Sequence, residues 1–193
     1  MPALIIAAAL AALLWATVRY HDSPSLPALL MAAAASNAAS LTRYEGWCIA
    51  GALVVLSGIA RWRAGFRAWS LVPYLGAAVA LFLLLGKGST GVWFTTSGFF
   101  VPDPVSLGHP LTALTFVVRG ALSLGSPIVL GLGLVGAIRL IVTTRRTPAS
   151  WLPLALLAAA ALPWYAFVQG HPFRVRYMVP LVAAGCVMAG FVV

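Results

Sequence analysis

The stretch Trp151-Leu-Pro-Leu-Ala-Leu-Leu-Ala-Ala-Ala-Ala-Leu-Pro-Trp-Tyr-Ala-Phe-Val168 decides the fold class. It carries no charged side chain, and its length falls within the range of about 17–25 apolar residues with which an α-helix crosses a bilayer. Arginines precede it and the polar turn at Gln169 follows it. The pattern therefore predicts a membrane-spanning helix.

Apolar runs of the same character occur along the whole chain. The others cover residues 2–18, 27–41, 47–60, 69–85, 121–142 and 178–193. The second and third runs count separately, because residues 27–60 are too long for one span and are interrupted at 43–46. As one broken unit they would reduce the total from seven to six. We expect an all-α polytopic transmembrane helical bundle of six to seven membrane segments, with residues 1–193 forming a single transmembrane domain.

The composition supports lipid as the solvent. Of the 193 residues 62% are hydrophobic, only 8% are charged, and the mean hydropathy is +1.02. A soluble domain carries about 25% charged residues, because its surface contacts water. So few charges would not cover a water-facing surface, and an integral protein of the bacterial cytoplasmic membrane is predicted, with membrane lipid as a partner.

The net charge of +9 is explained by topology, not by nucleic acid. The arginines lie at the ends of apolar runs, without the basic tracts typical of nucleic-acid binding, so no nucleic-acid partner is expected. Lys and Arg concentrate in cytoplasmic loops. Residues 61–67 and 139–146 are therefore expected in the cytoplasm. Residues 43–46, a loop at about 86–120 and residues 169–177 are expected on the extracytoplasmic side.

The loop at about 86–120 is rich in Gly, Pro and aromatic residues, and it contains Asp103 and His109. Loops of this length are usually functional or disordered. Asp103, between two prolines, is interpreted either as a turn residue or as a catalytic base. His109, in Gly-His-Pro, has the same two interpretations.

The segment Thr42-Arg-Tyr-Glu-Gly-Trp47 also has two interpretations. Thr42 followed by Glu45 is a capping-box pattern, which predicts the start of the third helix. Alternatively, Arg43 and Glu45 have a function, because charges near a membrane are costly unless they are paired or used.

The late loop contains His171, Arg174, Arg176 and Tyr177. Its two arginines oppose the positive-inside trend, and a guanidinium group binds phosphate in a bidentate manner. We favour phosphate or pyrophosphate recognition over the alternative of interfacial anchors. The chain shows no metal-ligand spacing, phosphate loop or dinucleotide fingerprint, so no metal and no cofactor are predicted.

Two of these segments carry a resemblance to a known family. Ala-Ser-Leu-Thr-Arg43-Tyr-Glu45-Gly-Trp and the later Phe-Arg-Val-Arg176-Tyr177-Met-Val-Pro180 resemble motifs of the polytopic GT-C glycosyltransferases, in the branch of protein mannosyltransferases and aminoarabinose transferases. The resemblance implies transfer of a sugar, with inversion, from a polyprenyl-phosphate-linked donor on the extracytoplasmic face. The residue patterns described above leave Glu45 and Asp103 as the catalytic candidates, and the resemblance implies that the arginines of the late loop lie near the lipid phosphate. The substrate-binding candidates are Arg43, His109, His171, Arg174, Arg176 and Tyr177.

The chain departs from this family in one respect. The family carries its catalytic acid in a first outer loop, and no acidic loop follows the first apolar run here. The chain therefore resembles the middle and later part of such an enzyme, which would need a partner chain or a preceding segment to supply the missing elements. The alternative is a non-enzymatic membrane protein, either a transporter-like module or an assembly subunit. Dependence on a polyprenyl-phosphate carrier separates the two classes.

Overall fold

The computed structural model describes residues 2–42, 44–64, 71–91, 93, 102–143 and 148–192. Within these ranges every regular element is a helix, so the predicted all-α class is confirmed. The first four helices are α1 (Pro2–Asp22), α2 (Leu26–Thr42), α3 (Glu45–Ala64) and α4 (Leu71–Thr90). The remaining elements are α5 (Pro110–Leu124), α6 (Pro127–Thr143), η2 (Pro148–Ala160), α7 (Ala161–Val168), η3 (Val175–Met178) and α8 (Val179–Ala189).

Proline and serine set several of the helix boundaries. Pro24 follows the end of α1, where it disfavours helical backbone at the preceding residue. The Ser25 hydroxyl then accepts a hydrogen bond from the Ala28 N–H at 3.4 Å, at the start of α2. Pro110 and Pro127 stand at the first positions of α5 and α6, where the missing N–H has no intrahelical partner to lose.

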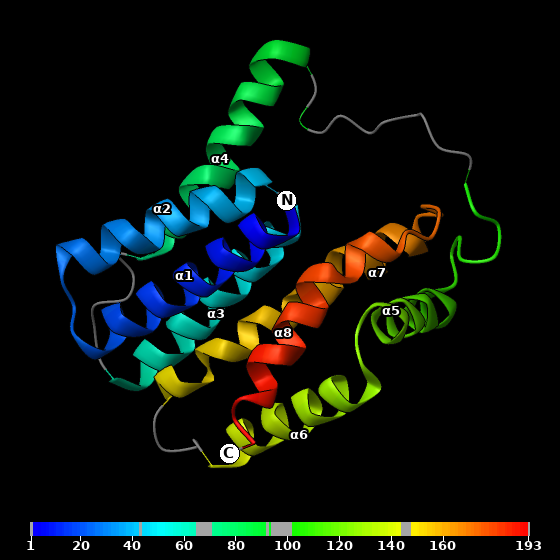
Figure 1. Cartoon of the computed structure of the whole chain (residues 1–193). Helices are drawn as coiled ribbons and strands as arrows, with labels where there is room; N and C mark the ends of the chain where they lie inside the picture. Colours follow the sequence, from blue (N-terminus) through cyan, green and yellow to red (C-terminus); the bar gives the residue numbers. More distant parts are fainter. Residues whose placement is uncertain are drawn as a thin grey trace.

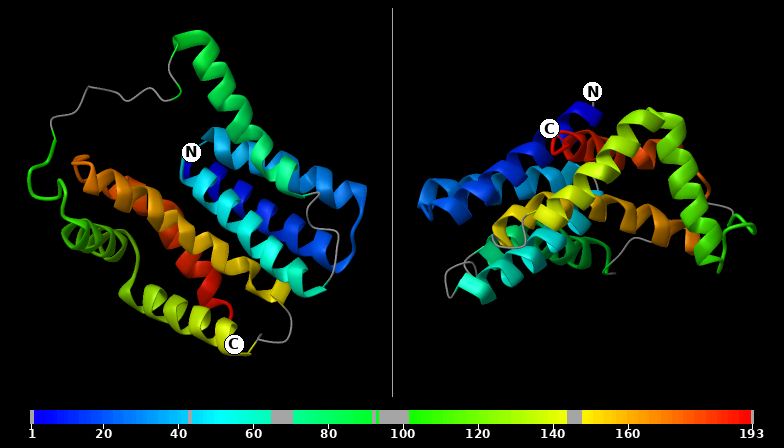
Figure 2. Two further views of the ribbon diagram at one scale, coloured as in Figure 1. Left: turned by 180° about the vertical axis from the view of Figure 1, so that it is seen from behind. Right: turned by 90° about the horizontal axis from the view of Figure 1, so that it is seen from below.

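The larger hydrophobic core joins the N-terminal helices to the C-terminal ones. Its buried members come from α1, α2, α3, η2 and the two helices α6 and α8, with Leu13, Leu53 and Leu152 among the fully buried side chains. α1 packs on α2, and α3 packs on η2. Figure 1 shows these helices slanting in one common direction, with η2 and α7 forming one continuous rod, and Figure 2 shows that they overlap in depth; this slab of helices is called the helix layer. A smaller core lies between α5, α7 and η3.

Glycines bring α6 and α8 into backbone contact. A Cβ at Gly133 would lie 2.6 Å from the carbonyl oxygen of Gly185, and a Cβ at Gly136 would overlap the carbonyl oxygen of Met188. Small residues allow such close approach, which is how helices associate when the hydrophobic effect between them is weak. The same device joins α2 to α3, where a Cβ at Gly46 would lie 2.6 Å from the Ala39 carbonyl oxygen.

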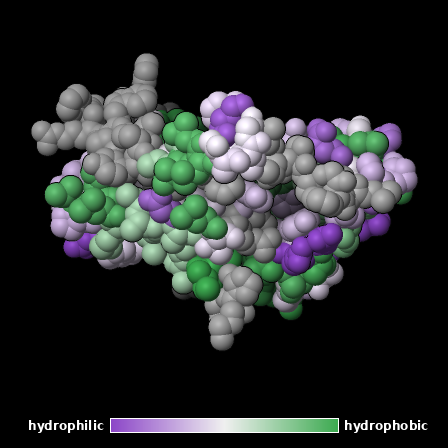
Figure 3. Space-filling model, turned by 90° about the horizontal axis from the view of Figure 1, so that it is seen from above, coloured by the Kyte–Doolittle hydropathy of each residue, from purple (hydrophilic) through white to green (hydrophobic). Residues whose placement is uncertain are grey.

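One helical segment in the described ranges, Ser150–Val168, is long and apolar enough to cross a membrane, and the bent pair α5 and α6 would add a second if it forms one span. The predicted six to seven spans therefore stay a prediction. Large apolar side chains nevertheless reach the surface in many places, among them Leu111, Ile128 and Leu134. Figure 3 shows apolar residues over much of one face.

The helix expected at residues 121–142 is interrupted near its start. The chain breaks within it: α5 ends at Leu124, α6 begins at Pro127, and the two helices are bent by 118°. Pro127 disfavours helical backbone at the residue before it, and Gly125 adopts an extended conformation. The loop expected at about 86–120 is also shorter, since α4 continues to Thr90 and α5 begins at Pro110.

The helix ends gather at two ends of the layer. The turn between α1 and α2, the end of α3 and the start of η2 lie at one end in Figures 1 and 2. The turn between α2 and α3, the end of α7 and the start of α8 lie at the other. The segments expected on opposite sides of a membrane are thus separated along the layer, while the sidedness itself stays a prediction.

Candidate functional site

A glycine turn reverses the chain at the end of α7. Gly170 has φ +79°, a conformation that side chains with a Cβ rarely adopt. Its N–H donates to the Phe167 carbonyl at 2.9 Å, and the His171 N–H donates to the Ala166 carbonyl at 2.9 Å. This pair of bonds is the Schellman pattern, which satisfies the last carbonyls of a helix. The turn releases His171 and Arg174 from the helix and aims the chain toward η3.

The segment 102–109 docks directly on this turn. The Asp103 N–H donates to the Gly170 carbonyl, and the Gly108 N–H donates to the Val168 carbonyl, both at 2.8 Å. Pro102 and Leu107 lie so close to Gly170 that a Cβ there would meet them at 3.2 and 3.1 Å. Two segments far apart in the sequence are therefore fixed together at one end of the helix layer.

Asp103 holds this docked segment in shape. Its Oδ1 accepts a hydrogen bond from the Val105 N–H at 2.9 Å, which is an Asx turn. The turn role predicted for Asp103 is therefore present. A carboxylate has further acceptor sites, so a proton-accepting role for the same group stays a prediction.

His109 and Ser106 complete the segment. His109 precedes α5 and is exposed, and its N–H donates to the Ser106 carbonyl at 3.0 Å. Within the described part of the chain, the buried Ser106 hydroxyl makes no hydrogen bond.

The surroundings of His171 favour the neutral form of its imidazole. Its partial burial lowers the pKa below the ordinary 6.5, and the nearby positive charge of Arg174 lowers it further. Both causes disfavour the imidazolium ion. An anion bound at the turn would offset the effect of Arg174 and raise the pKa of His171. A shift of this pKa would therefore indicate anion binding at the turn.

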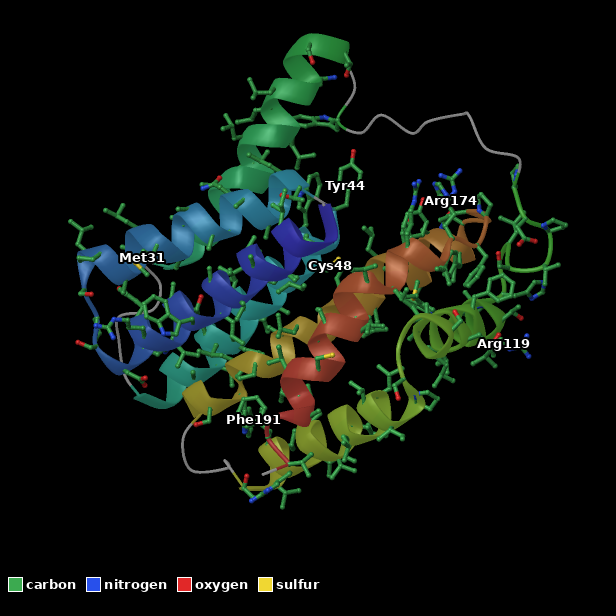
Figure 4. All side chains as sticks on the ribbon, in the orientation of Figure 1. Met31, Tyr44, Cys48, Arg119, Arg174 and Phe191 are labelled. Atoms are coloured by element: carbon green, nitrogen blue, oxygen red, sulfur yellow. The ribbon has the colours of Figure 1, made fainter. Side chains whose placement is uncertain are left out.

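Arg174 and Arg176 are both exposed at this end of the layer, and Figure 4 shows Arg174 projecting beyond the end of the helices. The guanidinium carbon of Arg176 lies 5.8 Å from the ring centroid of Tyr177, within the range of a cation–π contact. Tyr177 itself is half-buried. The two cations are thus presented outward from a partly buried aromatic base.

Aromatic rings form that base. Phe116 from α5 contacts both Phe167 from α7 and Phe173 from the turn, with centroids 5.9 and 5.6 Å apart. Phe167 also lies 6.4 Å from Tyr177. Such pairs stabilise by about 0.5–1.5 kcal/mol beyond their buried area. The sequence interpretation missed this cluster, although Phe173 beside Arg174 was visible as a signal. Gly170, just after the last apolar residue of α7, was a second signal, as a helix-ending glycine.

The structure brings together six of the predicted site residues; the side chains of the other two lie outside the described residues. His171, Arg174, Arg176 and Tyr177 share one turn, and the docked segment adds Asp103 and His109. Arg43 lies outside the described residues, and so does the side chain of Glu45, whose backbone begins α3. Tyr44, between them, lies at the same end of the layer as Arg174 (Figure 4).

The capping role predicted for Thr42 is wrong. Thr42 is the last residue of α2, and its hydroxyl donates to the Ala38 carbonyl at 2.5 Å within that helix. The α2–α3 junction is instead held by Trp47, whose indole N–H donates to the Ser40 carbonyl at 3.0 Å. Tyr44 packs edge-on against Trp47 at 5.3 Å. The capping box needs Glu45 at the third position of the helix, whereas Glu45 is the first residue of α3 and Thr42 still belongs to α2.

Comparisons with protein-family models, with curated proteins and with solved structures find no match for this chain. The resemblance to GT-C glycosyltransferases stays a prediction. Among the described residues, no group of three or more His, Cys, Asp or Glu side chains is placed to hold a metal ion.

Proposed function

We propose that this chain is part of a polytopic membrane glycosyltransferase of the GT-C type, which binds a polyprenyl-phosphate-linked sugar donor at the turn containing Arg174, Arg176 and Tyr177. The observation that carries the proposal is the docking of segment 102–109 on the α7 turn through Asp103 and Gly108. It brings a carboxylate to the end of the layer where two exposed arginines lie. The apolar surface of the helices suits a lipid carrier, whose tail stays in the bilayer.

The proposed chemistry assigns a step to each group. An acceptor hydroxyl oxygen bonds to the anomeric carbon of the sugar, and the bond from that carbon to the lipid phosphate oxygen breaks. The acceptor proton passes to a carboxylate, for which Asp103 and Glu45 are the candidates. The arginines stabilise the negative charge that develops on the departing polyprenyl phosphate. A partner chain or a preceding segment would supply the first acidic loop of the family.

Arg176 tests the donor site. A hydrogen bond to a charged group contributes about 1.5–3 kcal/mol, so Arg176→Ala is expected to weaken binding of polyprenyl phosphate by roughly ten- to a hundredfold. Arg176→Lys should recover only part of the loss, because an ammonium group keeps the charge but lacks the bidentate fork. Binding is measured on the full chain in nanodiscs, with a labelled polyprenyl phosphate.

Arg19 provides the matched control. Its guanidinium lies 5.6 Å from the ring of Trp15 on α1, at the opposite end of the layer. Arg19→Ala removes the same charge and should leave binding unchanged. Equal losses in the two alanine variants would mean that net charge alone attracts the lipid, and the donor site would be abandoned.

Among the described residues, the broken pair α5 and α6 favours the alternative. Interrupted helices line the solute sites of many transporters. A transporter would move solute into vesicles at the same rate with or without polyprenyl phosphate. Such a result, together with wild-type behaviour of Arg176→Ala, would favour the transporter-like module.

A further inference from the structure

Helix α5 does not follow the common direction of the helices in the larger core. It runs across the direction of the η2–α7 rod, as the two views in Figure 2 agree, and it meets α6 at 118°. Its 15 residues span about 22 Å at 1.5 Å per residue, short of the roughly 30 Å of a hydrocarbon core. If the rod crosses a membrane, α5 lies along the membrane plane.

The exposed surface of α5 is divided into two parallel stripes. Leu111, Leu114, Val118 and Leu122 are all exposed, and their spacing of three and four residues puts them on one face. Each of these is followed by a polar residue, which places a second stripe beside the first. The polar stripe consists of Thr112, Thr115, Arg119 and Ser123.

The third face of α5 is already occupied. Ala113, Val117, Gly120 and Ala121 are buried, and Gly120 is close-packed against Met178 and Phe173. The helix is therefore held by its inner face to the turn that carries the arginines. Its apolar stripe is left outside the protein, and the exposed Arg119 stands beside it.

We infer that α5 is an interfacial helix, with its apolar stripe among the acyl chains and Arg119 on the lipid phosphates of an anionic membrane surface. An amphipathic helix that lies in the interface has this division, with apolar residues on one face and a cation on the other. Arginine reaches headgroups while its stem covers apolar surface. The inference rests on the membrane-spanning part of the proposed function, and it would place the donor turn at headgroup depth.

Spin labels along α5 test the inference in the full chain. Cys48 and Cys186 are first replaced by Ala, with circular dichroism as the check on folding, and single cysteines are labelled in nanodiscs that contain phosphatidylglycerol. Collision rates with oxygen, which concentrates in acyl chains, and with a water-soluble nickel chelate are then compared. We expect a high oxygen-to-nickel ratio at positions 114, 118 and 122 and a low ratio at 112, 115 and 123.

Spin labels at Leu157 on η2 and at Leu134 on α6 distinguish a failure of the interfacial-helix inference from a failure of the proposed membrane-spanning rod. Nickel access at 114, 118 and 122, combined with oxygen access at Leu157 and Leu134, would overturn the interfacial helix while leaving the spanning rod intact. Nickel access at Leu157 would overturn both. Low collision rates with both reagents on the apolar stripe would show that protein, such as a second copy of the chain, covers it, and this too would overturn the inference.

Arg119 tests the contribution of charge. With the label at position 122, Arg119→Glu is expected to lower the oxygen-to-nickel ratio in anionic nanodiscs, because the lipid phosphates repel the new carboxylate. Arg119→Lys should keep the ratio of the parent, since a lysine also reaches the headgroups. An unchanged ratio in Arg119→Glu would remove Arg119 from the proposed contact with lipid phosphate.

Discussion

The two ends of the helix layer use their cations in different ways. Where α1 turns into α2, Arg19 stacks on Trp15, and His21 hydrogen-bonds the buried Ser57 hydroxyl of α3 at 3.1 Å. The two basic side chains described there, Arg19 and His21, each contact another side chain of the protein. At the other end, Arg174 directly precedes η3 and Arg176 belongs to it, and both are exposed beside the aromatic cluster. Arg19 is exposed as well, so the difference lies in His21, which ties the first end to the core, whereas the cations described at the second end are two exposed arginines that a ligand can reach.

Phe167→Ala should have the largest effect, because this fully buried ring joins α7 to both Phe116 and Phe173. Such truncations cost about 3–5 kcal/mol of unfolding free energy. Leu13→Ala in α1 is the matched control, with an expected cost of about 2–5 kcal/mol. Unfolding in detergent should show both losses, and polyprenyl-phosphate binding should fall only in Phe167→Ala. Equal binding in both would contradict an aromatic base for the arginines.

Gly170→Ala should have the next largest effect. The φ of +79° and the contacts with Pro102 and Leu107 leave little room for a methyl group. Holding a residue with a Cβ in such a conformation costs about 1–3 kcal/mol. In Gly170→Ala, hydrogen exchange of the Asp103 and Gly108 backbone amides should become faster, because their hydrogen bonds to the Gly170 and Val168 carbonyls depend on this turn. Gly51→Ala in α3, where a Cβ meets open space, is the control and should leave their exchange unchanged.

Ser57→Ala tests the anchoring end and should have a smaller effect. Losing one hydrogen bond costs about 0.5–1.5 kcal/mol, here at the contact with His21. The midpoint temperature of thermal unfolding should fall slightly, and polyprenyl-phosphate binding should be unaffected. A loss of binding in this variant would show that the two ends are coupled, and the division between them would need revision.

The dependence of folding stability on pH through His171 should be the smallest of these effects. Because the folded-state pKa is lowered, its contribution to stability is complete above the unfolded value of about 6.5 and is lost as the pH falls through the folded pKa. Wild type should therefore lose stability between neutral and mildly acidic pH, and His171→Gln should lose less. Bound phosphate should raise the His171 pKa, which an NMR titration would detect. An unchanged pKa would place the anion away from this turn.

Much of the candidate site could be read from the sequence, because its members are neighbours. His171, Arg174, Arg176 and Tyr177 stand within one short loop, and the positive-inside trend made its arginines conspicuous. The contact between Asp103 and Gly170 could not be read, since backbone hydrogen bonds between distant segments have no local signature. The prediction for Thr42 failed because the local pattern does not fix where a helix begins: α2 continues through Thr42, and α3 begins only at Glu45.

The helical class and the apolar character of the segments follow from the sequence, because composition and run length limit which solvent a helix can face. The course of residues 110–143 depended on the tertiary structure. Pro127 permits a straight continuation with a kink as well as a sharp bend, and the packing of α5 on Phe173 and of α6 on Gly185 selects the bend. Such packing is a property of surfaces that meet only in the folded chain. For that reason the three faces of α5 became visible only when its neighbours were in place.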